Sequence, residues 1–130
     1  MALKEDISTE VEGIFKGQWT TRTGYVVPAP KEVALETNDG VEFESVSVLY
    51  ADLSASTHMV DAKKPKFSAE VYRAFLATAA RVIRAESGDI TAYDGDRVMA
   101  VFLGDDKETR AARCALKINF AVKKIVTPML

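Results

Sequence analysis

Two acidic residues, each placed at the end of an apolar segment, have the clearest chemical potential in this sequence. Asp52 closes the segment 46–52, and Asp96 lies in an Asp-Gly-Asp-Arg turn within the segment 88–103. Asp-Gly between apolar runs is a strong hairpin signal, so we expect two short strands with Asp96 directly after the glycine. If this hairpin lies beside the 46–52 strand, the two carboxylates converge. Paired oxygen ligands, completed by phosphate and water, form the usual Mg²⁺ site for phosphoryl transfer.

Small residues follow the first of these acids. They allow the backbone to approach a ligand and are suited to begin a helix, whose free N–H groups bind anions. They are Ser54, Ala55, Ser56 and Thr57. The residues before Asp52 are apolar on both faces, which predicts a central strand covered on two sides rather than an edge strand. A carboxylate beside a phosphate-sized cradle indicates a site for a metal and a nucleotide.

The segments 50–57 (Tyr-Ala-Asp-Leu-Ser-Ala-Ser-Thr) and 88–102 (Gly-Asp-Ile-Thr-Ala-Tyr-Asp-Gly-Asp-Arg-Val-Met-Ala-Val-Phe) together resemble the catalytic domain of class III nucleotidyl cyclases, the adenylate and guanylate cyclase family. The resemblance implies that Asp52 and Asp96 are catalytic and bind two divalent ions, Mg²⁺ or Mn²⁺, with help from the Leu53 carbonyl. It also implies that the 53–57 backbone and the Thr57 hydroxyl hold the triphosphate, and that active sites are shared across a head-to-tail homodimer.

Two positions depart from the family pattern where the base is read. Ala92 stands where the family usually has a lysine that reads a purine, and Tyr50 stands where phenylalanine is common. The added space and the tyrosine hydroxyl favour a smaller pyrimidine, because a polar group in a pocket discriminates strongly. Ordinary sheet packing is the alternative for Tyr50. Arg97 has two open interpretations, a contact to phosphate or base and a surface ion pair.

The segment before the motifs is similar to the N-terminal arm of the pyrimidine cyclases of the bacterial antiphage system called Pycsar. Tyr50, Ala92 and this arm together place UTP first as substrate, CTP next and ATP third, with the cyclic product as a second messenger. The family supplies an asparagine and an arginine from the part of the domain after the last helix, and this sequence ends at Leu130 before them. Two explanations of this ending stay open: the sequence is the front portion of a longer cyclase, or it is a natural short form that does not catalyse.

The elements that position these motifs begin with an amphipathic helix. One stripe within 4–16 is formed by Ile7, Val11, Ile14 and Phe15, and it packs either on its own domain or on a partner subunit. Residues 17–40 read as a loop or arm with short strands, whose Trp19 indicates either a lid over the core or a dimer contact. We expect an N-terminal helix and arm at 1–44 and the front portion of the cyclase catalytic domain at 45–130.

The second region should contain two crossover helices before and after a hairpin. We expect a short helix at 55–61, a long helix capped by Ser68 and stopped by Gly88, and a last helix at 108–126 ended by Pro128. The inward faces are expected at Val71, Phe75, Leu76, Ala79, Val82 and Ile83, and at Ala112, Ala115, Ile118, Val122 and Ile125. This order predicts an α+β, ferredoxin-like cyclase core of βααββαβ type that lacks its C-terminal part.

Composition limits the function classes. With 130 residues, 48% of them apolar, and a formal charge of -2, the chain fits one globular domain with no charge excess for nucleic acid. The lone Cys114 excludes an internal disulfide and fits a reducing compartment, and no apolar run is long enough to span a bilayer, so we expect a cytoplasmic protein without a membrane contact. The rival classes are a non-catalytic nucleotide-binding or dimerisation module, an adenylate cyclase, and a domain phosphorylated on Asp52.

Overall fold

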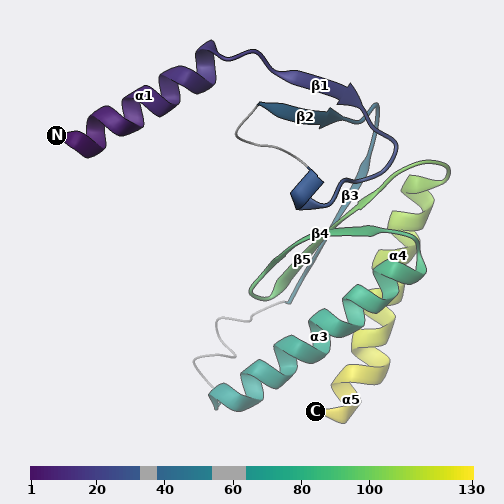
Figure 1. Cartoon of the computed structure of the whole chain (residues 1–130). Helices are drawn as coiled ribbons and strands as arrows, with labels where there is room; N and C mark the ends of the chain where they lie inside the picture. The colour runs from purple at the N-terminus through teal and green to yellow at the C-terminus, as the bar shows by residue number, and fades with distance from the viewer. Residues whose placement is uncertain (33–37, 54–63) are drawn as a thin grey trace. The chain divides into compact units, whose positions relative to one another are not determined.

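A computed structural model of the chain describes residues 1–32, 38–53 and 64–130, as Figure 1 shows. The chain forms two compact units, residues 1–44 and 45–130. The helix expected at 55–61 lies outside the described residues. Within the described ranges, no helix has the length and apolar character needed to cross a membrane.

The unit 45–130 is built on a three-stranded antiparallel sheet. Its strands are β3 (Ser47–Asp52), β4 (Asp89–Asp94) and β5 (Arg97–Phe102), in the order β3-β5-β4. The predicted hairpin is confirmed, and Gly95 adopts the positive φ of 60° that a tight turn requires and glycine tolerates. The central strand is β5, whereas the strand that ends in Asp52 lies at an edge of this sheet, so its prediction as a central strand is wrong here.

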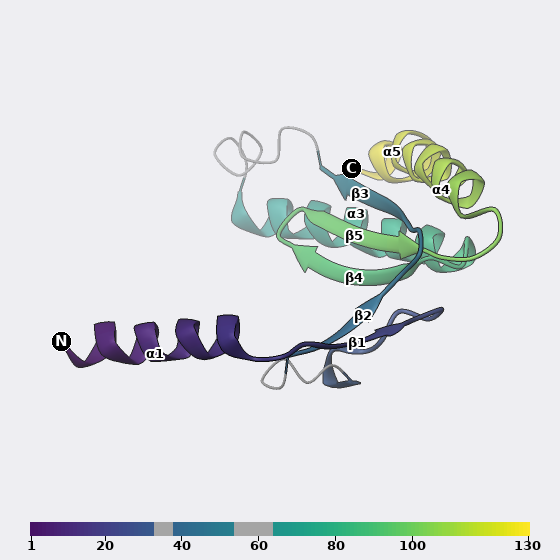
Figure 2. The ribbon, with the colours of Figure 1, turned by 90° about the horizontal axis from the view of Figure 1, so that it is seen from above.

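Two helices cover the same face of the sheet, as Figure 2 shows from above: α3 (Pro65–Ala85) and α4 (Lys107–Ala121). Alternate residues of β5 point toward both helices. The buried core is Phe75, Ala79, Ile83, Val98, Ala100, Phe102, Cys114 and Ile118. Of the predicted face of α3, Val71, Phe75, Ala79 and Ile83 are buried and Leu76 and Val82 pack against the core.

No described helix of this unit covers the other face of the sheet. Successive side chains of β3 point to opposite faces of the sheet: Leu49 packs on the core, whereas Val48 and Tyr50, on the other face, are 48% and 58% exposed. The prediction that this strand is covered on two sides is therefore wrong for the described residues. An apolar run predicted burial on both faces, but both helices lie on one side.

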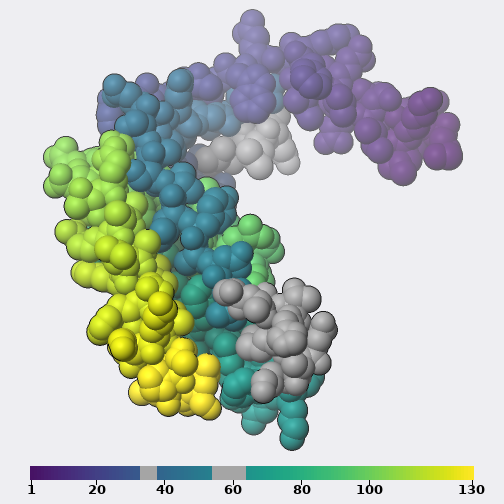
Figure 3. All heavy atoms as spheres, turned by 180° about the vertical axis from the view of Figure 1, so that it is seen from behind, coloured from purple at the N-terminus to yellow at the C-terminus, as the bar shows by residue number. Residues whose placement is uncertain are grey.

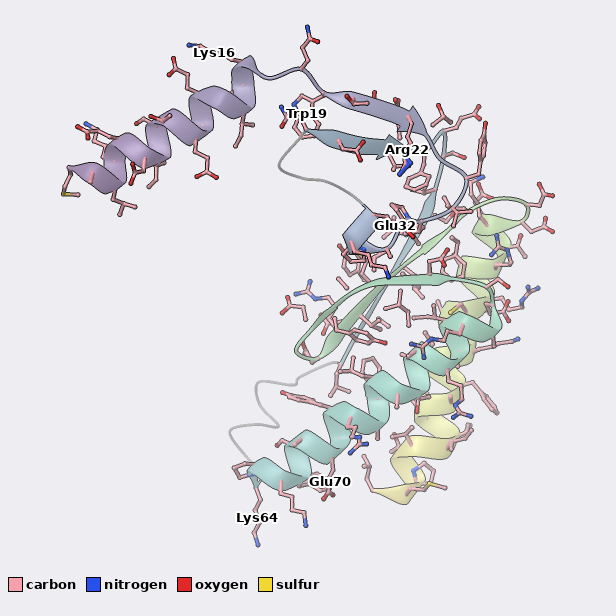
Figure 4. All side chains as sticks on the ribbon, viewed as in Figure 1. Lys16, Trp19, Arg22, Glu32, Lys64 and Glu70 are labelled. Carbon is pink, nitrogen blue, oxygen red and sulfur yellow. The ribbon has the colours of Figure 1, made fainter. Side chains whose placement is uncertain are left out.

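The limits of α3 differ from the prediction at both ends. The helix begins at Pro65, which suits a first helical position, and Ser68 is buried inside its first turns instead of capping it. In Figure 4, Lys64 and Glu70 project from this end of α3. At the other end Ser87 takes the left-handed φ of 60°, and the Gly88 N–H donates to the Ile83 carbonyl at 2.9 Å. This is a Schellman ending in which serine, not Gly88, occupies the left-handed position.

The inward face of α4 is shifted from the predicted one. Of the predicted residues, Ile118 is buried and Val122 packs against the core, whereas Ala112, Ala115 and Ile125 are exposed. Cys114 and Ala121 are buried as well. A π-helical turn, η3 (Val122–Val126), follows the helix and adds a residue to the turn, which moves the later side chains out of the α-helical stripe. Pro128 does not end this helix, because it lies within a last short turn, α5 (Thr127–Met129).

A buried carboxylate fastens the end of α3 to α4. Glu86 is 5% exposed, accepts a hydrogen bond from Arg113 Nε at 2.8 Å and is also bonded by Lys117. These two hydrogen bonds hold the pKa of Glu86 below its ordinary value. Arg110 adds hydrogen bonds to the backbone carbonyls of Glu86 and Ser87 at 3.3 and 3.2 Å. No local sequence pattern predicts this cluster, since the α3 end and its partners on α4 are 23 to 31 residues apart in the chain.

The unit 1–44 contains α1 (Ala2–Lys16), β1 (Thr20–Thr23), the 3₁₀ turn η1 (Pro30–Glu32) and β2 (Asp39–Glu42). The two strands pair in parallel, with Thr20 opposite Asp39. Gly24 lies where an added Cβ would stand 2.3 Å from Val41 Cγ1, so a larger residue does not fit after β1. The amphipathic helix predicted at 4–16 is confirmed, and none of its residues is buried. Trp19, labelled in Figure 4, is 59% exposed.

Candidate active site

The two predicted catalytic acids lie at neighbouring points of the backbone, Asp52 at the end of β3 and Asp96 in the turn directly before β5. Asp52, the last residue of β3, pairs with Arg97 of β5, and the next residue, Leu53, donates its N–H to the Asp96 carbonyl at 3.1 Å. The hairpin therefore lies beside β3 as expected. Asp52 is exposed and Asp96 is half-buried. Their roles as metal ligands stay a prediction, but the backbone places both acids where one bound group could reach them.

The donor set fits a hard divalent cation. Mg²⁺ and Mn²⁺ accept carboxylate and carbonyl oxygens and retain positions for phosphate and water, which Asp52, Asp96 and the Leu53 carbonyl would provide with a nucleotide. In residues 1–32, 38–53 and 64–130, no three His, Cys, Asp or Glu side chains gather as a metal cluster. The residues predicted as the phosphate cradle, Ser54, Ala55, Ser56 and Thr57, lie outside the described residues.

The predicted base-reading residues lie in one row across the open face of the sheet. Tyr50 of β3 pairs with Met99 of β5, and Met99 pairs with Ala92 of β4. A bulge between Ile90 and Ala92 sets this register. Since neighbouring strands are about 4.8 Å apart, Tyr50 and Ala92 flank Met99 at about 10 Å from each other. Two residues that are 42 positions apart in the sequence are thereby brought onto one surface.

Arg97 joins the acids to this row. Its guanidinium carbon lies 5.9 Å from the centre of the Tyr50 ring, and its Nη2 is 3.7 Å from Asp94 Oδ2. The side chain of Asp94 is 85% exposed, so this ion pair is worth little. Both interpretations of Arg97 thus find support, because the residue forms a surface ion pair and also carries positive charge next to Tyr50 and opposite Asp52.

A groove of about 360 Å³ opens beside Asp52, between β3 and α4. Figure 3 shows the two walls next to each other, with β3 in blue and the C-terminal helical segment in yellow-green and yellow. The groove is lined by Asp52, Leu53, Phe75, Ile118, Asn119 and Val122, among others. It gives the region around Asp52 an apolar wall with one amide, Asn119, on the α4 side.

Sequence reasoning missed Met99 and Asn119. Met99 could have been found by pairing the hairpin with the 46–52 strand, because every second residue of β5 shares a face with Tyr50. Asn119 carried no signal, since an asparagine in an amphipathic helix ordinarily faces solvent. Its place beside Asp52 depends on how α4 crosses the sheet.

The sequence matches curated uridylate cyclases along its whole length. It is 50% identical over 130 residues to one from Burkholderia cepacia, with 100% of this chain and 57% of that protein covered. It is 47% identical over 128 residues to one from Xanthomonas perforans, with 98% and 55% covered. The chain thus spans about half the length of the curated relatives it matches. A scan for protein-family models found no match.

Solved structures of class III cyclase domains share the fold. An adenylyl cyclase from P. aeruginosa aligns with a TM-score of 0.60 at 14% identity, over 65% of this chain and 46% of that one. A guanylate cyclase domain from Catenaria anguillulae, solved in complex with GTP, aligns with a TM-score of 0.57 at 18% identity, over 62% and 46%. A dimeric guanylyl cyclase domain from Blastocladiella emersonii aligns with a TM-score of 0.56 at 17% identity, over 62% and 47%. The predicted α+β cyclase core and the family resemblance are confirmed.

Proposed function

Taking this chain as a homologue of uridylate cyclases with the class III cyclase fold, we propose that it supplies the metal-binding and base-reading part of a pyrimidine nucleotide cyclase. In the proposed reaction the 3′-hydroxyl of a nucleoside triphosphate attacks the α-phosphate, the bond to the β-phosphate breaks and pyrophosphate leaves. UTP is the first choice of substrate and CTP the second. The observation that carries the proposal is the placement of Asp52 beside Asp96, joined by the hydrogen bond from Leu53 to the Asp96 carbonyl.

In this proposal residues 45–130 are the front portion of the catalytic domain, and the two acids and the Leu53 carbonyl hold the divalent ions. When bound, the ions activate the 3′-hydroxyl and neutralise charge on the triphosphate. Asp52 and Asp96 orient the phosphates at the strand ends, and Ser54, Ala55, Ser56 and Thr57 bind them through the backbone and the Thr57 hydroxyl. Arg97 adds positive charge on the same face.

The base lies across the row formed by Tyr50, Met99 and Ala92. Tyr50 offers a hydroxyl for a hydrogen bond to the pyrimidine, Met99 an apolar floor, and Ala92 the space that a longer side chain would fill. A site that hydrogen-bonds its substrate discriminates more strongly than one that differs by shape alone, for which a methylene gives about 10–200-fold. The row supports selection of a pyrimidine.

The open face that holds this row also suits a second subunit. The exposed Val48 and Tyr50 supply apolar and aromatic surface, which is typical of interface cores. We propose a head-to-tail homodimer that shares its active sites across this face. The cyclic product would act as a cytoplasmic second messenger, in antiphage defence by resemblance to the pyrimidine cyclases of that system.

The test is product analysis with the purified full-length protein. UTP, CTP, ATP and GTP are incubated separately with Mn²⁺ or Mg²⁺, and cyclic nucleotide and pyrophosphate are quantified. We expect cyclic UMP from the unaltered protein and none above background from Asp52→Asn or Asp96→Asn. Asp105→Asn, which removes an exposed acid outside the site, is the matched control and should retain activity.

Two outcomes would contradict the proposal in different ways. Cyclic AMP as the only product would reject the pyrimidine assignment while keeping the cyclase. Nucleotide binding that depends on Mn²⁺ and Asp52, with no cyclic product from any of the four triphosphates, would favour the non-catalytic module. Asp52 and Asp96 would then serve nucleotide binding alone.

A further inference from the structure

A second surface, away from the open face of the sheet, has the properties of a helix-binding groove. It has a volume of about 870 Å³ and runs along one side of α3, where Tyr93 of β4 forms a wall. Its floor contains Leu76, Ala77 and Ala80, and small residues allow a helix to approach closely. The helical positions that line it repeat at intervals of three and four residues from Ala69 to Arg84. The groove therefore follows about four turns of one helix.

Three arginines give this groove a positive rim. Arg73, Arg81 and Arg84 line it and are exposed. None of them takes part in an ion pair with another residue that the structure describes. An apolar floor whose rim arginines pair with no acid among the described residues suits an amphipathic helix that carries carboxylates beside its apolar stripe.

The chain itself contains such a helix. In α1 the apolar stripe of Leu3, Ile7, Val11 and Ile14 is 63%, 52%, 43% and 45% exposed. At 100° per residue Asp6 and Glu10 fall along one side of this stripe. A helix of only 15 residues is marginal in water unless its apolar face packs against something.

We propose that the groove on α3 receives α1 of a second copy of this chain. The lengths agree, since the 15 residues of α1 and the 16 residues from Ala69 to Arg84 span about 22 and 24 Å. The apolar stripe lies on the alanine floor, and Asp6 and Glu10 face the arginine rim. Every copy has one helix and one groove, so two copies satisfy each other by reciprocal exchange, as closed twofold symmetry requires.

Disulfide trapping in the full-length protein tests the contact directly. One preparation carries Ile7→Cys on the apolar stripe and another carries Ala77→Cys on the groove floor. We expect mild oxidation of the mixture to give a cross-linked heterodimer on a non-reducing gel. The matched control replaces Ile7→Cys with Thr9→Cys, which lies on the opposite side of α1 at 100° per residue, and should give little product. Equal trapping through both positions would overturn the proposal.

A charge-swap experiment separates exchange between copies from docking within one chain. In the trapping pair, reversing the rim with Arg81→Glu and Arg84→Glu should lower the cross-linked yield about tenfold, because like charges then face each other. Adding Asp6→Arg and Glu10→Arg to the other partner should restore it. A chain with both cysteines that closes only an internal disulfide would overturn exchange between copies. Neither readout uses nucleotide or turnover, so the result is independent of the proposed activity.

Discussion

Gly88 and Phe102 form the tightest glycine contact in the unit that carries the candidate active site. A Cβ added at Gly88 would stand 2.7 Å from Phe102 Cζ, 2.8 Å from Phe102 Cε1 and 2.9 Å from Ile83 Cγ2. Phe102 and Ile83 are fully buried, so neither can move aside freely. Gly88→Ala should therefore overpack this junction between α3 and the hairpin.

The expected cost of Gly88→Ala is about 2 kcal/mol, in the middle of the 1–3 kcal/mol range for overpacked cores. In a domain of this size that lowers Tm by about 8–16 °C. Phe102→Leu alone should cost about 1–2 kcal/mol. This is less than the roughly 3–5 kcal/mol for truncating a buried phenylalanine to alanine, because leucine keeps part of the side chain. Combined, the two changes should cost about 1 kcal/mol less than their sum, because leucine withdraws the two ring atoms that the new methyl group meets.

Urea unfolding followed by circular dichroism measures the four free energies of this cycle. Gly13→Ala is the control substitution, since its Cβ would meet nothing within 4 Å, and it should not lower Tm. Costs that add to within about 0.3–0.5 kcal/mol would show that the residues do not interact and would refute the steric argument. A Gly88→Ala protein as stable as the unaltered one would refute it equally.

Further changes test other features of the fold. Glu86→Gln should lower the free energy of unfolding at neutral pH and reduce the decrease in that free energy on acidification. The folded pKa of Glu86 is depressed, so its stabilisation is present above the unfolded pKa of about 4.3 and is lost as pH falls through the folded pKa. Urea midpoints from pH 3 to 7 check this, and an unchanged profile would contradict it. Burial raises the pKa of Cys114 to about 11, so a thiol reagent at pH 8 should modify it only at the rate of unfolding. Ser87→Gly should raise stability by about 1 kcal/mol in urea titrations by relieving the left-handed conformation, whereas Ser87→Ala should not. For the proposed cyclase activity, Ala92→Lys should lower kcat/KM for UTP at least about tenfold by filling space beside Met99, with Thr91→Lys as the adjacent control.

Local patterns alone predicted the secondary structure around the candidate site. The Asp-Gly turn predicted the hairpin, and the three- and four-residue spacing of apolar residues predicted α3 and its buried face. The two motifs were sufficient to identify the cyclase fold and to single out Asp52 and Asp96. These features depend on short stretches of sequence, where residue type and period determine the backbone.

Other features were decided only by tertiary packing. An apolar run suggested that the strand ending in Asp52 is covered on both faces, but both helices lie on one side and leave Tyr50 exposed. The register that brings Tyr50, Met99 and Ala92 into one row depends on a bulge and on pairing between distant strands, neither of which has a local signal. The ion pairs of Glu86 with Arg113 and Lys117 likewise join residues far apart in the chain. The sequence therefore determined which of the described elements form and which residues are candidates for the chemistry, while long-range packing determined which of them share a surface.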